Sequence, residues 1–212
     1  MKRCIILFVS LLLLFFCGCG ASEKNTESSP LPTATPEPKF EPGTIDGSSY
    51  TNDFLSLSFE APEGWVFASE EEFSLLLGSG TEQLQSDIQL FPSEVGSTFY
   101  EFYAYGIDGE SIIMTVEDLS AHDGGTLLSV KDYIDTLTSR YSELSTVKYD
   151  VGKSYEQSIA GHSCYVLPLS IEENGVFQRN CAFRSGAYMV TITISAHSEE
   201  ELSDLEAYIT AN

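Results

Sequence analysis

The sequence HSCYVLPLSIEENGVFQRNCAFRSGAYMVTITISA, residues 162–196, contains three apolar runs with short connections between them. β-Branched and aromatic residues dominate these runs, which predicts strands over residues 162–171, 176–184 and 187–196. Asn174-Gly175, between the first two runs, is typical of a two-residue hairpin turn. Strands joined this closely pair antiparallel, so the stretch predicts part of an antiparallel sheet.

Further strands are expected upstream of this stretch. The residue patterns indicate strands over 54–59, 98–107 and 110–119, and Asp108-Gly109 joins the last two as another two-residue hairpin signal. Residues 148–160 favour one or two short strands. Hairpins therefore dominate the strand pattern.

Capping signals place the helices. Ser69 with Glu72, and Ser198 with Glu201, each form a capping box, and Ser129 caps another helix. The expected apolar positions are Phe73, Leu76 and Leu77 after Ser69; Leu84, Ile88 and Phe91 before Pro92; Val130, Tyr133, Ile134, Leu137, Tyr141 and Leu144 after Ser129; and Leu202, Leu205, Tyr208 and Ile209 after Ser198. Since a βαβ alternation is missing, we expect an α+β fold, an antiparallel β-sheet with helices packed against it.

The beginning of the globular part resembles a known family. Tyr50-Thr51-Asn52, the strand Leu55 to Phe59, and Pro62-Glu63-Gly64-Trp65 before a capped helix resemble the start of PsbP-like domains. These α-β-α sandwiches are named after an extrinsic subunit of photosystem II, and similar domains occur in lipoproteins of Gram-positive anaerobes. The resemblance implies a fold and a binding or scaffolding role, and it implies no catalytic residues.

The N-terminus is typical of a bacterial lipoprotein precursor. Lys2 and Arg3 precede an apolar run over residues 5–16, shorter than the roughly 20 residues that span a bilayer. Phe16-Cys17-Gly18-Cys19 then resembles a lipobox, in which the last cysteine receives diacylglycerol and the signal is cut before it. Cys17 is rejected as the acceptor because Phe16 would stand where cleavage requires a small residue. We expect a signal peptide over residues 1–18 and a lipidated Cys19, with conventional secretion as the alternative.

The expected location follows from this anchor. The two acyl chains on Cys19 would hold the protein stably in the lipid bilayer, at the extracytoplasmic face of the cell membrane. Residues 19–49 contain Pro30, Pro32, Pro36, Pro38 and Pro42 among polar residues, which predicts a disordered, extended linker. A proline-rich recognition motif is the alternative, but its aromatic-lined partner domains are not expected outside a bacterial cell. One globular domain then covers residues 50–212.

The charge balance excludes one class of partner. The chain has 32 Asp and Glu against 10 Lys and Arg, a formal charge of −22. Nucleic acid needs a basic footprint, so a nucleic-acid partner is not expected. Docking of the domain onto anionic lipid is opposed for the same reason. A negative field could gather cations or a basic partner, although solubility alone also explains it.

The domain contains two cysteines, which are candidates for a disulfide or for a nucleophile. Cys164 and Cys181 would share a face of neighbouring strands but lie out of register by several residues, so a disulfide and two buried free thiols both remain open. Cys164 could form a catalytic pair with His162 or His197. His162 and Cys164 are two apart on one expected strand, however, and are therefore neighbours by geometry alone.

Metal and ligand sites have weak candidates. The densest set of residues that can ligate a metal is Glu117, Asp118, His122 and Asp123. Their spacing does not match a calcium-binding loop, so a solvated acidic loop is the favoured interpretation. No cofactor is expected. An aromatic strand carries Tyr100, Phe102, Tyr103 and Tyr105, which either pack in the core or line a groove; core packing is favoured, for Trp65 as well.

The preferred hypothesis is a membrane-anchored extracytoplasmic lipoprotein whose domain binds a protein or wall component without catalysis. The anchor, the linker and the lack of a catalytic set motivate it. The first alternative is a lipoprotein that binds a small ligand or a divalent cation. The weaker alternative is a hydrolase that uses Cys164.

Overall fold

The computed structural model describes residues 38–69, 71–73, 97–144, 147–171, 173 and 175–212, which belong to one unit that begins at Glu37. The expected signal peptide, Cys19 and residues 20–37 of the expected linker lie outside these ranges, as does the helical stretch at 84–91. No helix in the described ranges is long and apolar enough to cross a membrane.

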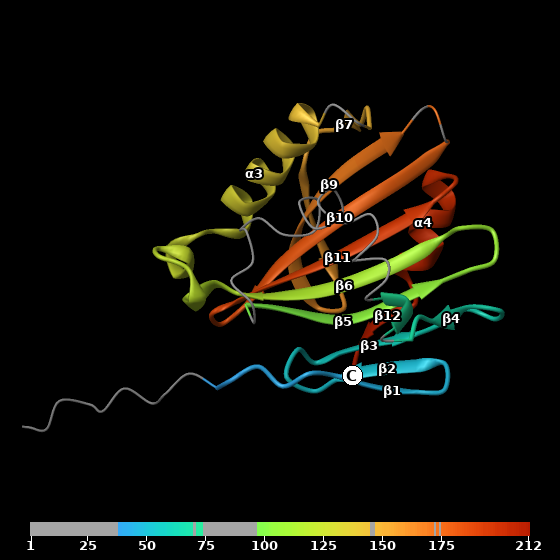
Figure 1. The fold of residues 1–212 in the computed structure, drawn as a ribbon, viewed down its shortest axis with the longest axis horizontal. Helices are drawn as coiled ribbons and strands as arrows, with labels where there is room; N and C mark the ends of the chain where they lie inside the picture. The colour runs from blue at the N-terminus through green and yellow to red at the C-terminus, as the bar shows by residue number, and fades with distance from the viewer. Residues whose placement is uncertain (1–37, 70, 74–96, 145–146, 172, 174) are drawn as a thin grey trace, which may run out of the picture. The chain divides into compact units, whose positions relative to one another are not determined.

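The three runs of residues 162–196 form neighbouring strands of the larger sheet (Figure 1), β9 (His162–Ile171), β10 (Val176–Ser185) and β11 (Tyr188–Ala196). The sheet has the order β4-β5-β6-β11-β10-β9-β7, with β8 also paired to β9, and every pairing is antiparallel. The other strands are β4 (Val66–Phe67), β5 (Thr98–Tyr105), β6 (Ser111–Asp118), β7 (Asp150–Val151) and β8 (Tyr155–Ile159). The expected strands therefore exist in the expected order.

Both hairpin turns are longer than predicted. Ile171 pairs with Val176, so four residues connect β9 and β10 instead of the two residues Asn174-Gly175. Between β5 and β6 the amide of Gly106 donates to the Glu110 carbonyl at 2.9 Å, which leaves a three-residue loop that ends at Gly109. Gly109 has a φ of 100°, a left-handed conformation that glycine adopts without strain.

A smaller sheet contains residues that the sequence places in the linker. Its order is β1-β2-β3-β12, formed by β1 (Thr44–Asp46), β2 (Ser49–Asn52), β3 (Leu57–Glu60) and β12 (Ile209–Ala211). The predicted boundary at residue 50 is therefore wrong, because residues 38–49 belong to the globular domain. The aromatic ring of Phe40 is buried against Phe99 and Tyr188, at centroid distances of 4.9 and 5.5 Å. Local composition could not predict these contacts, because Phe99 and Tyr188 are far from Phe40 in the sequence.

Two other element boundaries differ from expectation. The strand expected over 54–59 begins only at Leu57, because a turn intervenes in which the Ser56 amide donates to the Asp53 carbonyl. The last helix was expected to include Tyr208 and Ile209, but it ends at Glu206. Ile209 instead pairs with Phe59 of β3. The helix therefore ends early, because strand pairing with β3 is favoured over another helical turn.

Helices cover the two faces of the larger sheet. The helix α3 (Val130–Glu143) begins at the expected cap Ser129, and α4 (Glu199–Glu206) begins at the expected cap Ser198. Two short 3₁₀ helices, η1 (Leu119–Ala121) and η2 (Gly125–Leu127), precede α3. The Ser69–Glu72 capping box is also present, with residues 71–73 helical.

Each central strand supplies two cores. On β10, Cys181 joins the cluster beneath the smaller sheet and α4, while its neighbour Ala182 joins the cluster beneath α3. Val190 and Met189 of β11 alternate in the same way. Burial on both faces explains why these strands are apolar almost throughout. The structure thus has the expected α+β class, an antiparallel sheet with helices packed against it.

Candidate functional site

The cysteine that could act as a nucleophile is inside the domain. Cys164 is fully buried on β9, and burial raises the pKa of its thiol to about 11. The nearby His162 ring stacks on Phe183 at 4.1 Å, and its Nε2 lies 2.8 Å from the Leu55 carbonyl oxygen. His197 Nε2 lies instead 2.9 Å from the Asp108 carbonyl oxygen. A protonated, inaccessible thiol is a poor nucleophile, and both histidines make structural contacts.

The two cysteines of the domain are free thiols in the structure. Cys181 lies opposite Val166, so Cys164 and Cys181 occupy diagonal positions on one face. Diagonal neighbours in a sheet are about 7–8 Å apart, with their Cβ atoms somewhat closer, so a disulfide would need a shift in register. The arrangement corresponds to the alternative of two buried thiols.

The residues proposed as metal ligands make separate contacts in the structure. Glu117 Oε1 lies 3.7 Å from His122 Nε2, with both side chains largely buried. Asp118 caps η1 by accepting from the amide and hydroxyl of Ser120 at 2.9 and 2.6 Å. Asp123 is exposed. Nowhere in the described ranges do three or more His, Cys, Asp or Glu residues come together as ligands for a metal ion.

The aromatic strand divides between two faces of the sheet. Phe102 is buried and stacks on Phe59 at 5.2 Å, as the core interpretation predicts. Tyr103 and Tyr105 are half-buried, stack on one another at 5.2 Å, and belong to the other face. Phe73 contacts Tyr103 at 6.0 Å. The core interpretation therefore fits Phe102 better than the tyrosines.

A pocket that the sequence analysis missed lies beside α4. It has a volume of about 170 Å³, and we call it the α4 pocket; its lining consists of Pro62, Trp65, Glu110, Glu201, Asp204, Leu205 and Tyr208. Four of these residues follow a helical spacing of three, four and seven from Glu201, so they form one stripe at α4 and its C-terminal end. That spacing was readable in the sequence, but the turn and loop that close the pocket were not.

Gly106 permits the close approach of two lining residues. A Cβ atom at this position would lie 2.7 Å from the indole Nε1 of Trp65 and 2.8 Å from Oε2 of Glu110. Both distances are shorter than real Cβ contacts allow. A side chain at residue 106 would therefore displace the Trp65 indole or the Glu110 carboxylate from its place at the pocket. Trp65, expected to be a packing residue, does pack near Phe59, with ring centroids 6.5 Å apart, and it also lines the pocket.

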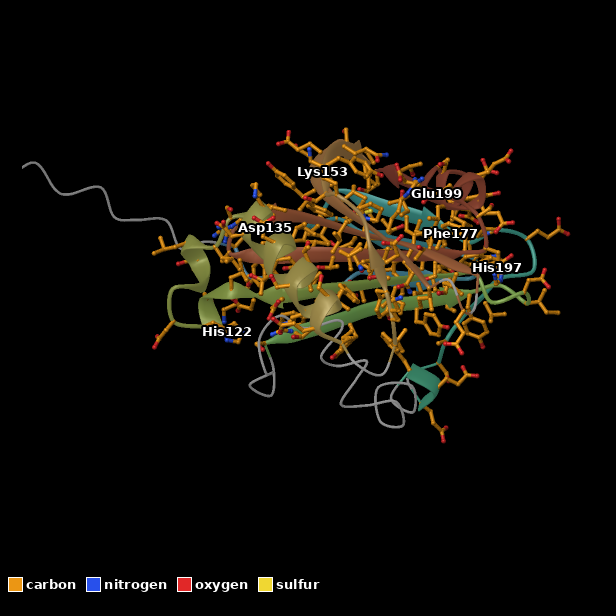
Figure 2. The ribbon with its side chains drawn as sticks, turned by 90° about the horizontal axis from the view of Figure 1, so that it is seen from above. His122, Asp135, Lys153, Phe177, His197 and Glu199 are labelled. Atoms are coloured by element: carbon orange, nitrogen blue, oxygen red, sulfur yellow. The ribbon has the colours of Figure 1, made fainter. Side chains whose placement is uncertain are left out.

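Two other regions of the domain are weaker candidates for a recognition site than the α4 pocket. A larger cavity of about 590 Å³ is lined by Lys148, Tyr149, Asp150 and Glu173, which present both signs of charge. The loop with His122 lies at the end of the sheet away from His197 (Figure 2), so it is separate from the α4 pocket. The α4 pocket combines apolar walls with charges of one sign, and it is the better candidate for recognition.

Comparison with known proteins gives distant structural similarities. No family model and no curated protein matches the sequence. The structure is similar to cyanobacterial PsbP (CyanoP) from Synechocystis, with a TM-score of 0.48 and 10% identity over 81% of this chain and 98% of that one. LpqN, which is involved in cell envelope biogenesis of Mycobacterium tuberculosis, gives a TM-score of 0.39 and 12% identity over 73% of this chain and 82% of its own.

A protein of unknown function from Pseudomonas aeruginosa gives a TM-score of 0.32 and 16% identity over 46% of this chain and 65% of that protein. All three TM-scores lie below 0.5, so the functions of these proteins are not transferred to this chain.

Proposed function

We propose that this chain is a lipid-anchored extracytoplasmic binding protein whose domain docks a protein partner without catalysing a reaction. The α4 pocket is the observation that carries the proposal. Its lining provides indole, phenol and carboxylate groups, which suit recognition, while the thiol of Cys164 is buried and protonated. A hydrolase that uses Cys164 would need that thiol accessible and ionised.

The anchor in this proposal rests on the N-terminal sequence. Cys19 follows Gly18 at the end of a signal-like apolar run. Because the domain begins near residue 38, the tether comprises residues 19–37. Nineteen residues in polyproline II conformation would reach about 60 Å when fully extended. The domain would then act close to the membrane, within reach of other membrane proteins.

Replacing the acceptor cysteine tests the anchor. Cys19→Ala should release the protein from membranes or block its maturation, because no thiol would remain at the lipidated position. Cys17→Ala is the matched control and should keep both membrane retention and the mass added by lipid. Unchanged retention and mass in the Cys19→Ala protein would contradict the anchor.

Cross-linking on intact cells tests the binding role. A dominant protein captured by the full chain, and lost when residues 38–212 are deleted with the anchored N-terminus kept, would support docking through the domain. Equal capture by the anchored N-terminus alone would contradict it. A saturable rise in melting temperature with calcium or sugars would instead favour the small-ligand alternative.

A further inference from the structure

The helix α4 has two acidic faces, and Arg179 compensates the first of them. Arg179 of β10 is 9% exposed and lies against the first face. Its guanidinium donates to Glu199 Oε2 at 2.8 Å, to Glu206 Oε2 at 3.2 Å and to Ser203 Oγ at 3.2 Å. A buried, hydrogen-bonded arginine balances the carboxylates here, so this face is part of the structural core.

The second face borders the α4 pocket. Glu201 and Asp204 lie on it, and Glu110 approaches it from the β5–β6 loop. Glu201 accepts from the His197 amide at 2.9 Å, which orients its carboxylate. Within the ranges that the structure describes, none of the ion pairs links a lysine or arginine to these three carboxylates. The pocket thus offers negative charge that no lysine or arginine described here neutralises.

The walls of the α4 pocket favour a cation attached to an apolar stem. Trp65 and Tyr208 supply aromatic rings, and the indole is the side chain that attracts cations most strongly. Pro62 and Leu205 supply aliphatic surface. Lysine and arginine combine an apolar stem, which packs along apolar surface, with a charged end that stays in polar surroundings. This combination matches the walls and rim of the pocket.

Size and surroundings point to a side chain of a larger partner. The volume of about 170 Å³ is below the roughly 300 Å³ at which small-molecule pockets begin. Apolar residues extend the surface beyond the pocket, since Ile107 in the β5–β6 loop is 96% exposed and Val66, next to Trp65, is 49% exposed. A polypeptide could cover these residues while one of its basic side chains enters the pocket.

We propose that the α4 pocket receives a lysine or arginine side chain of a basic polypeptide partner. This inference rests on the proposed function and names the chemistry of its partner. The formal charge of −22 would draw such a segment toward the domain, and the pocket would fix its register. The carboxylates of Glu110 and Asp204 bind the cationic end, while Trp65 and Tyr208 contact the stem.

The single tryptophan of the chain, Trp65, makes the test direct. Full-length protein would be titrated with N-acetyl-tetralysine amide while Trp65 fluorescence is recorded. We expect a saturable change in emission, because the side chain would cover the indole. The same peptide with its four amines acetylated is the control and should leave the emission unchanged. No change with tetralysine up to millimolar concentration would overturn the proposal.

Charge variants locate the binding. The double substitution Glu110→Gln with Asp204→Asn should weaken tetralysine binding about tenfold, since two partly exposed ion pairs are lost together. The double substitution Glu200→Gln with Asp123→Asn is the matched control, because it removes two negative charges at exposed residues that do not line the pocket. Its affinity should stay within about twofold of the original protein. Equal weakening in both variants would overturn the proposal in favour of general charge attraction.

Three further outcomes separate this inference from the proposed function. If spermidine binds as tightly as tetralysine, the pocket is a small-cation site and the docking inference is wrong. If intact-cell cross-linking captures the same partner with the Glu110→Gln/Asp204→Asn chain, the inference fails while the proposed function stands. If no capture depends on the domain, the proposed function fails even where tetralysine binds.

Discussion

Glu101 joins the N-terminal hairpin to the larger sheet through one carboxylate oxygen. Its Oε2 accepts from the Gly43 amide at 2.7 Å, from the Tyr50 hydroxyl at 2.6 Å and from Asn52 Nδ2 at 3.2 Å. Tyr50 is fully buried, and burial followed by the hydrogen bond to Glu101 raises the pKa of its phenol. These bonds hold β1 and β2 against β5, so the carboxylate stabilises contacts between the two sheets.

Replacing Glu101 should therefore destabilise the domain. Glu101→Gln keeps the shape but loses the charge that strengthens three hydrogen bonds, and we expect the free energy of unfolding to fall by about 1–3 kcal/mol. Urea denaturation measures the change. Glu41→Gln is the control, since that side chain is exposed and makes no described hydrogen bond. A loss no larger than that of the control would contradict the role given to Glu101.

His197 should make stability depend on pH. Its hydrogen bond to the Asp108 carbonyl, and then the charges of Glu201 and Glu110, raise the pKa of the imidazole. A group with a raised pKa stabilises the fold fully below its unfolded value, about 6.5, and loses that contribution as pH rises through the folded value. The difference in unfolding free energy between the original protein and His197→Ala should therefore shrink as the pH rises above about 6.5. A difference that is flat with pH would be inconsistent with this account, and an NMR titration of His197 gives the pKa directly.

Single residues were predictable where their role is local. The caps Ser69, Ser129 and Ser198 follow from short sequence patterns, because a cap and its partner amide are three residues apart. The role of Arg179 was not predictable, because its carboxylate partners are 20 and 27 positions away in the sequence. The need for glycine at residue 106 was not predictable either, because it depends on how closely Trp65 approaches. The α4 pocket was missed for the same reason.

At the scale of elements, the strands were predictable but their connections were not. The β-branched and aromatic runs in residues 162–196 predicted β9, β10 and β11 within one residue at each end. Asn174-Gly175 indicated a shorter turn than the register allows. The C-terminal helix ended early because Ile209 finds a partner in Phe59. Each error arises where pairing across the sheet outweighs a local preference.

The cap of α3 offers a quantitative test at this scale. Ser129 Oγ accepts from the Asp132 amide at 3.1 Å, so Ser129→Ala should lower the unfolding free energy by about 1 kcal/mol. Ser139→Ala in the same helix is the control, because its hydroxyl donates to the Asp135 carbonyl and alanine is the better helix former. Urea midpoints should fall for the first variant and hold or rise for the second. Equal midpoints would contradict the capping role.

At the scale of the whole molecule, the domain contains two cores on opposite faces of one sheet. The core beneath α3 is assembled from residues 119–189, whereas the other core draws on residues from 40 to 209. The second core therefore depends on both ends of the domain sequence. The order of predicted strands and helices indicated one domain of α+β class. Local composition could not show that the proline-containing segment at residues 38–49 completes the core, because its burial depends on distant aromatic rings.

Phe40 decides where the domain begins. Its ring is 8% exposed, packs edge-on against Phe54 at 5.4 Å, and its amide donates to the Tyr188 hydroxyl at 3.0 Å. Phe40→Ala should lower the unfolding free energy by about 3 kcal/mol, because the vacated space cannot collapse among surrounding rings. Lys39→Ala, at an exposed neighbouring position, should change it by less than about 0.5 kcal/mol. If both substitutions are neutral in urea denaturation, residues 38–49 act as linker after all, and the tether would reach from Cys19 to residue 49.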